Sequence, residues 1–106
     1  MIIVTGANGF IGSAMVWELN QKGLKDIVCV DTVSLQERNL LKKRDYSLFL
    51  LKDQLWDFLS TPSAKEKVTW IIHMGACSST TETNKEFLWE NNTYYTQRIW
   101  EWCREH

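Results

Sequence analysis

A spacing of three glycines near the start of the chain constrains its fold more than any other feature. Gly6, Gly9 and Gly12 follow a short β-branched apolar run, residues 1–5, and precede an amphipathic stretch that begins at Phe10. The apolar run suits a parallel strand buried on both faces, and the amphipathic stretch has helical spacing. The three glycines therefore mark a tight turn from a strand into a helix.

Each glycine of this turn has a separate task. Gly6 permits the tight turn, Gly9 lets a diphosphate approach the backbone because no Cβ intervenes, and Gly12 allows close packing of helix on strand. A diphosphate there would meet unpaired N–H groups at the positive end of the helix dipole. Asp31 closes a second apolar strand, where a carboxylate can accept hydrogen bonds from an adenosine ribose. This order of features predicts a dinucleotide site.

Short apolar runs and amphipathic stretches alternate along the rest of the chain. We expect a helix over residues 10–20 that buries Ile11, Met15 and Leu19 and stops at Gly23. The further expected elements are strands at 27–30, 47–51 and 68–73, a short helix at 54–59, a loop at 60–63 around Pro62, and a helix at 84–104. Alternating strands and helices build a parallel sheet with right-handed crossovers.

The predicted fold is α/β, with a Rossmann-like parallel sheet of about four strands in the order 3-2-1-4 and helices on both faces. We expect residues 1–106 to form the amino-terminal part of an NAD(P)-binding domain, with the sheet incomplete at the edge of its fourth strand. An exposed edge strand invites pairing with another chain, which favours a homo-oligomer.

Composition excludes several other classes of protein. The net charge of −1 gives no reason to expect a nucleic-acid partner. The first residues show neither a signal peptide nor a membrane span, so we expect a cytoplasmic protein without a membrane partner. Cys29, Cys77 and Cys103 lack the CxxC spacing, and only two histidines are present, so we expect neither disulfides nor a metal site.

The motif TGANGFIG, residues 5–12, resembles the fingerprint of extended short-chain dehydrogenases/reductases, which include epimerases and dehydratases of nucleotide sugars. Within that family, residues 73–82 (HMGACSSTTE) and 90–92 (ENN) resemble the epimerases of ADP-linked heptoses. The resemblance covers nearly the whole chain and is loose at residues 34–67. It implies that C6 of an ADP-linked heptose is inverted by transient oxidation with tightly held NADP, in the synthesis of the lipopolysaccharide core.

The resemblance also implies which residues contact the cofactor. Phe10 and Ile11 would meet its phosphates, Asp31 and Thr32 its adenosine ribose. The other implied contacts are the basic Arg38 and Lys52, the stretch Met74, Gly75, Ala76, Cys77 and Ser78, and Asn91. The hydroxyls of Ser78, Ser79 and Thr80 would touch substrate or nicotinamide, although a plain helix-entry loop remains the alternative for this run.

The preferred dinucleotide is a point on which the sequence conflicts with the resemblance. Asp31 favours NAD, because a carboxylate repels a 2′-phosphate. The resemblance implies NADP, and a basic run could supply phosphate donors: Arg38, Lys42, Lys43 and Arg44. A solvated surface run is the other interpretation of these four residues. We expect NADP, with NAD possible.

No residue of this chain is predicted to be catalytic. The superfamily uses a Tyr-x-x-x-Lys pair as its base, and the nearest sequence here, Tyr94 to Arg98, lies one βα unit too early. His73, which ends an apolar strand, is interpreted as a hydrogen-bonded core or edge imidazole. Two alternatives to the heptose epimerase stay open: another nucleotide-sugar epimerase or dehydratase, and an NAD(P)-binding module without chemistry.

Overall fold

Four short apolar runs form a parallel sheet. The computed structural model describes residues 1–74 and 95–106. The strands in the first of these segments are β1 (Ile2–Thr5), β2 (Ile27–Asp31), β3 (Leu48–Leu51) and β4 (Trp70–His73). They lie in the order β3-β2-β1-β4, and every pairing is parallel. The predicted fold class and strand order are therefore confirmed.

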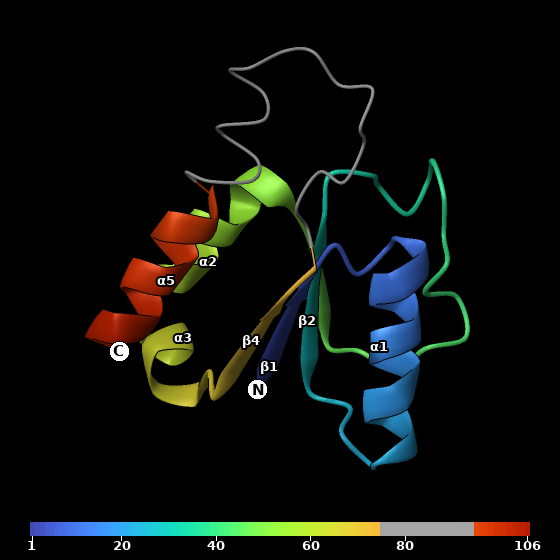
Figure 1. Ribbon diagram of the computed structural model, residues 1–106, viewed down its shortest axis with the longest axis horizontal. Helices are drawn as coiled ribbons and strands as arrows, with labels where there is room; N and C mark the ends of the chain where they lie inside the picture. Colours follow the sequence, from blue (N-terminus) through green and yellow to red (C-terminus); the bar gives the residue numbers. More distant parts are fainter. Residues whose placement is uncertain (75–94) are drawn as a thin grey trace. The chain divides into compact units, whose positions relative to one another are not determined.

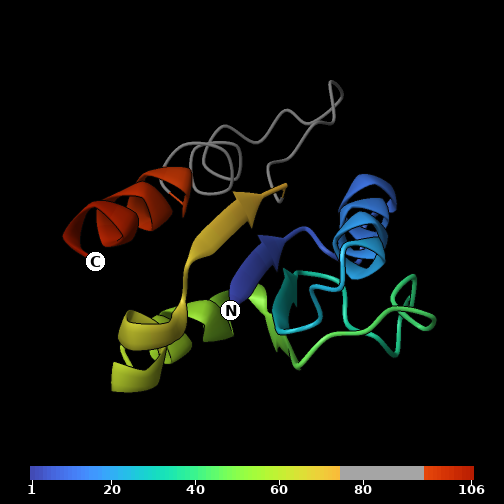
Figure 2. The ribbon, with the colours of Figure 1, turned by 90° about the horizontal axis from the view of Figure 1, so that it is seen from below.

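Helices cover both faces of this sheet (Figure 1, Figure 2). The helix α1 (Phe10–Gln21) connects β1 to β2. The connection from β3 back to β4 carries η1 (Lys52–Gln54), α2 (Leu55–Leu59) and α3 (Pro62–Lys67). These two connections run across the sheet in opposite directions, so right-handed crossovers place their helices on opposite faces.

The core between α1 and the sheet is made of small and medium aliphatic side chains. β1 and β2 are buried along their whole length, as expected for central strands of a parallel sheet. Val16 and Leu19 of α1 pack against them, and Leu41, from the β2–β3 connection, closes the cluster. Cys29 lies in the same cluster, and its burial raises the pKa of the thiol to about 12, so the thiol is not a nucleophile.

Two local predictions are wrong. The buried stripe of α1 consists of Gly12, Ser13, Val16 and Leu19, whereas Ile11 is 65% exposed. The stripe begins at Gly12 because only a residue without a side chain fits against the turn before the helix. Residues 62 and 63 belong to the helix α3, where a loop was expected. Thr61 caps this helix by accepting a hydrogen bond from the Ala64 amide (3.2 Å), and a proline is favourable in the first turn.

The end of α1 follows the prediction. Gly23 has a φ of +81°, which is left-handed backbone that favours glycine. The Leu24 amide donates to the Leu19 carbonyl (3.0 Å) and the Gly23 amide to the Asn20 carbonyl (2.9 Å), which together make a Schellman motif. The turn therefore satisfies carbonyls that the end of the helix leaves without partners.

Residues 75–106 form a second unit. Its described part is the helix α5 (Tyr95–Glu105), which buries Tyr95 and Ile99 and exposes Trp100. This confirms the carboxyl-terminal half of the predicted last helix. The remaining predictions in this unit lie outside the described residues, namely those for residues 84–94, Gly75, Ala76, Cys77, Ser78, Ser79, Thr80 and Asn91. Among the described residues, no helix is both long enough and apolar enough to cross a membrane.

Candidate functional site

The glycine turn lies at the carboxyl ends of the two central strands. Gly6 directly follows β1 and has a φ of +66°, a conformation that side chains rarely allow. The Gly9 amide donates to the Gly6 carbonyl (3.1 Å), and the Ala7 amide donates to Val30 at the end of β2 (3.1 Å). The turn therefore occupies the edge of the sheet at which open α/β folds bind ligands.

The other two glycines allow close backbone contacts. A Cβ on Gly12 would lie 2.0 Å from the Gly6 carbonyl oxygen, so any side chain there would displace the turn. A Cβ on Gly9 would lie 3.3 Å from the same oxygen, which is tight but tolerable. Gly12 thus lets α1 start directly on β1, as predicted, and Gly9 keeps the surface of the turn bare.

The amino terminus of α1 has no side-chain cap. Gly9 is the N-cap residue, and the first turn of the helix contains no acidic residue. Phe10 and Ile11, the first two helical residues, are 86% and 65% exposed. Their backbone N–H groups carry the positive end of the helix dipole and lack acceptors within the helix. This part of the turn can therefore bind an anionic group such as a diphosphate.

Asp31, at the end of β2, binds the other half of the turn. Its carboxylate accepts hydrogen bonds from the Asn8 amide (2.9 Å) and from the Val33 amide (3.0 Å), and the residue is only 9% exposed. Thr32 is exposed beside it, and its hydroxyl lies 3.5 Å from the carboxylate. Each carboxylate oxygen has further lone pairs. A contact from Asp31 to a ribose therefore stays a prediction, while its hold on the turn is a role that the sequence did not indicate.

Asn8 is a functional candidate that sequence reasoning missed. Its side chain is fully buried and lies against the segment of residues 33–40 that follows β2. The Nδ2 group donates to the Val33 carbonyl (3.1 Å), and the Oδ1 atom accepts from the Leu40 amide (2.9 Å). Asparagine often bonds to nearby backbone in turns. These partners lie more than 20 residues away, so the sequence alone gave no signal of them.

The predicted basic residues separate into two groups. Arg38 donates from Nε to the Asn8 carbonyl (3.0 Å), which brings it to the glycine turn. Arg44 donates from Nε to the Ser13 carbonyl of α1 (3.0 Å) and so ties the β2–β3 connection to the helix. Lys42 and Lys43 are exposed. Of the run expected to supply phosphate donors, Arg38 is thus the residue that contacts the turn.

The side chains of Thr5 and His73 meet at the carboxyl edge. The Thr5 hydroxyl at the end of β1 lies 2.5 Å from His73 Nδ1 at the end of β4. Burial, and then the nearby charge of Lys52, lower the pKa of His73 below its ordinary value. Lys52 therefore lies within electrostatic reach of His73, although it follows the opposite edge strand. Met74 is exposed, and its amide donates to the Thr5 carbonyl (3.2 Å).

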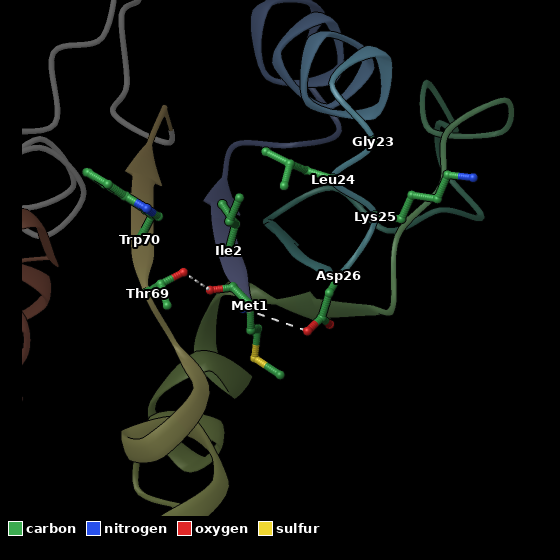
Figure 3. A pocket seen from close by; sticks show the side chains of 8 residues that line it. All are labelled: Met1, Ile2, Gly23, Leu24, Lys25, Asp26, Thr69 and Trp70. Carbon is green, nitrogen blue, oxygen red and sulfur yellow. Dashed lines mark hydrogen bonds and ion pairs between the residues drawn. The ribbon is translucent and has the colours of Figure 1, made fainter.

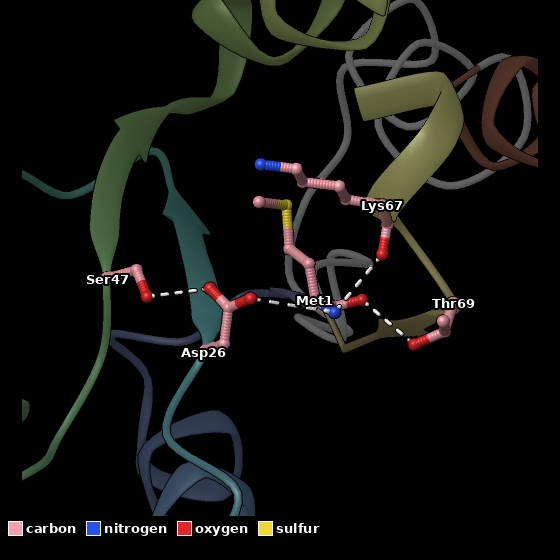
Figure 4. Close-up of polar contacts among 5 residues, drawn as sticks. All are labelled: Met1, Asp26, Ser47, Lys67 and Thr69. Carbon is pink, nitrogen blue, oxygen red and sulfur yellow. Dashed lines mark hydrogen bonds and ion pairs between the residues drawn. The ribbon is translucent and has the colours of Figure 1, made fainter. Parts of the chain in front are cut away.

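A hollow at the opposite edge of the sheet differs from this site. Met1, Leu24 and Trp70 are among the residues that line a pocket of about 440 Å³ at the amino ends of the strands (Figure 3). Asp26, also in its wall, accepts from the Ser47 hydroxyl (2.8 Å) and pairs with the Met1 ammonium group (3.7 Å; Figure 4). The polar groups here bond to one another.

The fold and the turn together define a Rossmann-type dinucleotide-binding domain. The chain belongs to the NAD-dependent epimerase/dehydratase family, whose family model matches residues 2–106. Curated relatives include a protein from Fusobacterium nucleatum subsp. nucleatum named ADP-L-glycero-D-manno-heptose-6-epimerase. It is 46% identical over 106 residues, which are 99% of this chain and 32% of that protein.

A second relative of the same name, from Nitratidesulfovibrio vulgaris, is 46% identical over 107 residues, 99% of this chain and 33% of that protein. The chain thus spans about a third of the length of these curated relatives. Among solved structures, MoeE5 in complex with UDP-glucose and NAD matches 96% of this chain and 31% of its own, with a TM-score of 0.69 at 25% identity. L-threonine dehydrogenase from Clostridium difficile shares the fold, with a TM-score of 0.73 over 98% of this chain and 33% of its own at 23% identity.

Proposed function

We propose that this chain is the dinucleotide-binding part of an ADP-heptose 6-epimerase that uses NADP and tolerates NAD. The observation that carries the proposal is the bare, uncapped amino terminus of α1 at the carboxyl edge of the sheet. The 46% identity with relatives named as ADP-heptose epimerases supports the choice of substrate.

A bound NADP supplies the acceptor, and then the donor, of a hydride at C6 of the ADP-linked heptose. The chain's own residues bind the dinucleotide and orient it. Amides of the first turn of α1 hold the diphosphate, Asp31 and Thr32 meet the adenosine ribose, and Arg38 and Lys52 supply positive charge. The proposed contacts beyond these are Phe10, Ile11, Met74, Gly75, Ala76, Cys77, Ser78 and Asn91 for cofactor and Ser78, Ser79 and Thr80 for substrate.

Two features of Asp31 and Arg38 support NADP over NAD. The Asp31 carboxylate is buried and accepts bonds from two backbone amides, which reduces its repulsion of a 2′-phosphate. Arg38 contacts the same turn residue, Asn8, through the Asn8 carbonyl. A guanidinium is suited to phosphate because it offers a planar fork of donors.

The setting of the protein belongs to the same proposal. We place it in the cytoplasm, as a homo-oligomer that serves synthesis of the lipopolysaccharide core. The 106 residues lack a Tyr-x-x-x-Lys pair, so we expect them to bind dinucleotide without turning over substrate.

A second candidate is an epimerase or dehydratase of a UDP-linked sugar. The similarity to MoeE5, whose structure holds UDP-glucose and NAD, favours it. The two candidates differ in the nucleotide of the substrate and agree on the glycine turn.

Binding at the turn is tested by titrating the chain with NADP⁺ and NAD⁺ in a calorimeter. Gly9→Asp places a carboxylate at the N-cap, where it suits the helix and repels a diphosphate. Gly9→Asn has nearly the same shape without the charge and is the matched control. We expect Gly9→Asp to weaken binding at least about tenfold more than Gly9→Asn does. Equal affinities for the two variants would overturn the proposed diphosphate site.

The reaction is tested in a chimera in which this chain replaces the aligned third of the Fusobacterium relative. We expect the chimera to interconvert the C6 epimers of the ADP-heptose, and Gly9→Asp in the chimera to abolish this. The unaltered relative is the positive control. A folded chimera that binds NADP⁺ and acts on a UDP-sugar instead would favour the second candidate.

A further inference from the structure

Asn8 and Arg38 hold each other across the glycine turn. Arg38 donates from its side-chain Nε to the backbone carbonyl of Asn8 (3.0 Å), and Asn8 donates from its side-chain Nδ2 to the backbone carbonyl of Arg38. Each residue therefore fixes the main chain of the other with its side chain. The pair joins two segments that lie 30 residues apart in the sequence.

The Asn8 side chain extends this hold along the whole 33–40 segment. Its amide lies against carbonyls of Val33 (3.1 Å) and Ser34 (3.4 Å) as well as that of Arg38, and its oxygen accepts from the Leu40 amide (2.9 Å). The side chain is completely buried, so water does not compete for these bonds. One asparagine thus ties this segment to the turn.

The 33–40 segment lies at the ribose end of the proposed dinucleotide. Asp31, which marks that end in Rossmann folds, bonds to the Asn8 amide, and Arg38 bonds to the Asn8 carbonyl. The Asp31 carboxylate and the Arg38 guanidinium therefore bond to the backbone of the same residue, Asn8. Among the described residues, Arg38 donates from Nε alone, so its two Nη groups remain for an anion.

We propose that Asn8 is a positioning residue that sets the preference for a 2′-phosphorylated dinucleotide by holding Arg38 beside Asp31. This inference rests on the proposed function, because it assumes that a dinucleotide occupies the turn. The Asn8 side chain touches the 33–40 segment and not the amides at the start of α1. Its removal should therefore impair recognition of the 2′-phosphate and leave the diphosphate contacts in place.

The test measures the dissociation constants of NADP⁺ and NAD⁺ for the full chain and its Asn8→Ala variant. We expect Asn8→Ala to weaken NADP⁺ binding about tenfold and NAD⁺ binding by less than about twofold. Arg38→Ala should give the same pattern. The double variant should lose no more than the worse single variant, because two residues that act as a unit are not additive.

Asn20→Ala is a matched control, because Asn20 lies near the end of the β1–β2 connection and Asn8 lies near its start. The Asn20 side chain also bonds to backbone groups, away from the glycine turn. Its Nδ2 group donates to the carbonyls of Asp45 (2.9 Å) and Leu24 (3.0 Å), and its Oδ1 atom accepts from the Asp45 amide (2.8 Å). We expect it to leave the ratio of the two affinities unchanged. Asn8→Ser, which keeps a smaller polar side chain, is the second variant if Asn8→Ala does not fold.

The outcomes separate the inference from the proposed function. The inference is overturned if Asn8→Ala weakens NADP⁺ and NAD⁺ binding equally, or if Asn20→Ala changes the ratio of the two affinities as much as Asn8→Ala does. Neither result would contradict the proposed binding of a dinucleotide at the turn. A wild-type chain that binds neither dinucleotide overturns the proposed function, and the inference with it. A wild-type chain that prefers NAD⁺ overturns the inference and the choice of NADP.

Discussion

The two edges of the sheet differ in how their polar groups are used. At the amino edge, the polar groups around Met1 and Asp26 pair with one another beside an open hollow. At the carboxyl edge, buried polar side chains hold a glycine turn, and the helix that follows it has no side-chain cap from its N-cap residue, Gly9. The hollow has a volume of about 440 Å³, but its polar groups bond to one another, whereas the bare start of α1 can bind an anion.

The largest difference in stability between the two edges is expected for substitutions of glycine, at Gly12 and Gly23. Gly12→Ala puts a methyl group 2.0 Å from the Gly6 carbonyl oxygen, and we expect a loss of at least about 3 kcal/mol in the free energy of unfolding. Gly23→Ala, near the amino edge, meets open space and strains only its own left-handed backbone, at about 1 kcal/mol. Urea unfolding measures both. A smaller loss for Gly12→Ala than for Gly23→Ala would contradict the packing that we describe.

Two aspartates give the next comparison. Asp31→Ala leaves the Asn8 and Val33 amides without their acceptor in a buried place, and we expect a cost of about 2–3 kcal/mol. Asp26→Ala removes an ion pair whose carboxylate side chain is 62% exposed, at less than about 1 kcal/mol. Thermal unfolding of the two variants should rank them in this order. The reverse ranking would place the stronger polar network at the amino edge.

The pH dependence of stability sharpens the comparison further. The pKa of His73 is lowered in the folded protein by burial and by the charge of Lys52, so the unfolded chain binds its proton more readily. The folded state is favoured most above the ordinary pKa of 6.5, and that advantage falls as pH drops below it. We expect His73→Gln to flatten the stability profile between roughly pH 7 and 5. The change is measured by urea unfolding across that range, with His106→Gln as the exposed control.

The smallest effect is expected at the hollow. Trp70 is 69% exposed in its wall, and Trp70→Ala should leave the affinity for NADP⁺ within about twofold of the wild type. Calorimetric titration measures it beside the Gly9→Asp variant. A tenfold loss would mean that the hollow, and not the turn, binds the dinucleotide.

The large features of the fold were accessible from the sequence because they follow from local patterns. Short apolar runs, rich in β-branched residues in β1 and β2, predicted the strands, and the stop at Gly23 followed from its place after an amphipathic stretch. The helix α3 was missed because Pro62 was interpreted as part of a loop, although proline with Thr61 before it also starts helices. Local rules allow both interpretations, and the structure shows a helix that is capped by Thr61 and buries Ala64.

The site was accessible only in outline. The glycine spacing predicted the place of the turn, because the backbone at Gly6 and Gly12 requires residues without a side chain. The burial of Asn8, the hold of Asp31 on the turn, and the division of Arg38 from Arg44 depend on which residues the 33–40 segment meets. Contacts between residues about 30 positions apart produce no periodic pattern from which a single sequence could predict them.

The double attachment of the Asp31 carboxylate has a consequence for redesign of cofactor use. The acid that ends the second strand of a Rossmann fold helps to select between the two nicotinamide dinucleotides, but here that acid also supports the turn. Replacing it would change affinity and folding together. Adaptation of this protein to a new redox carrier therefore has its open route through the exposed Gln36 and Glu37 of the 33–40 segment, rather than through Leu35, which packs on the core, or Arg38, which bonds to the turn.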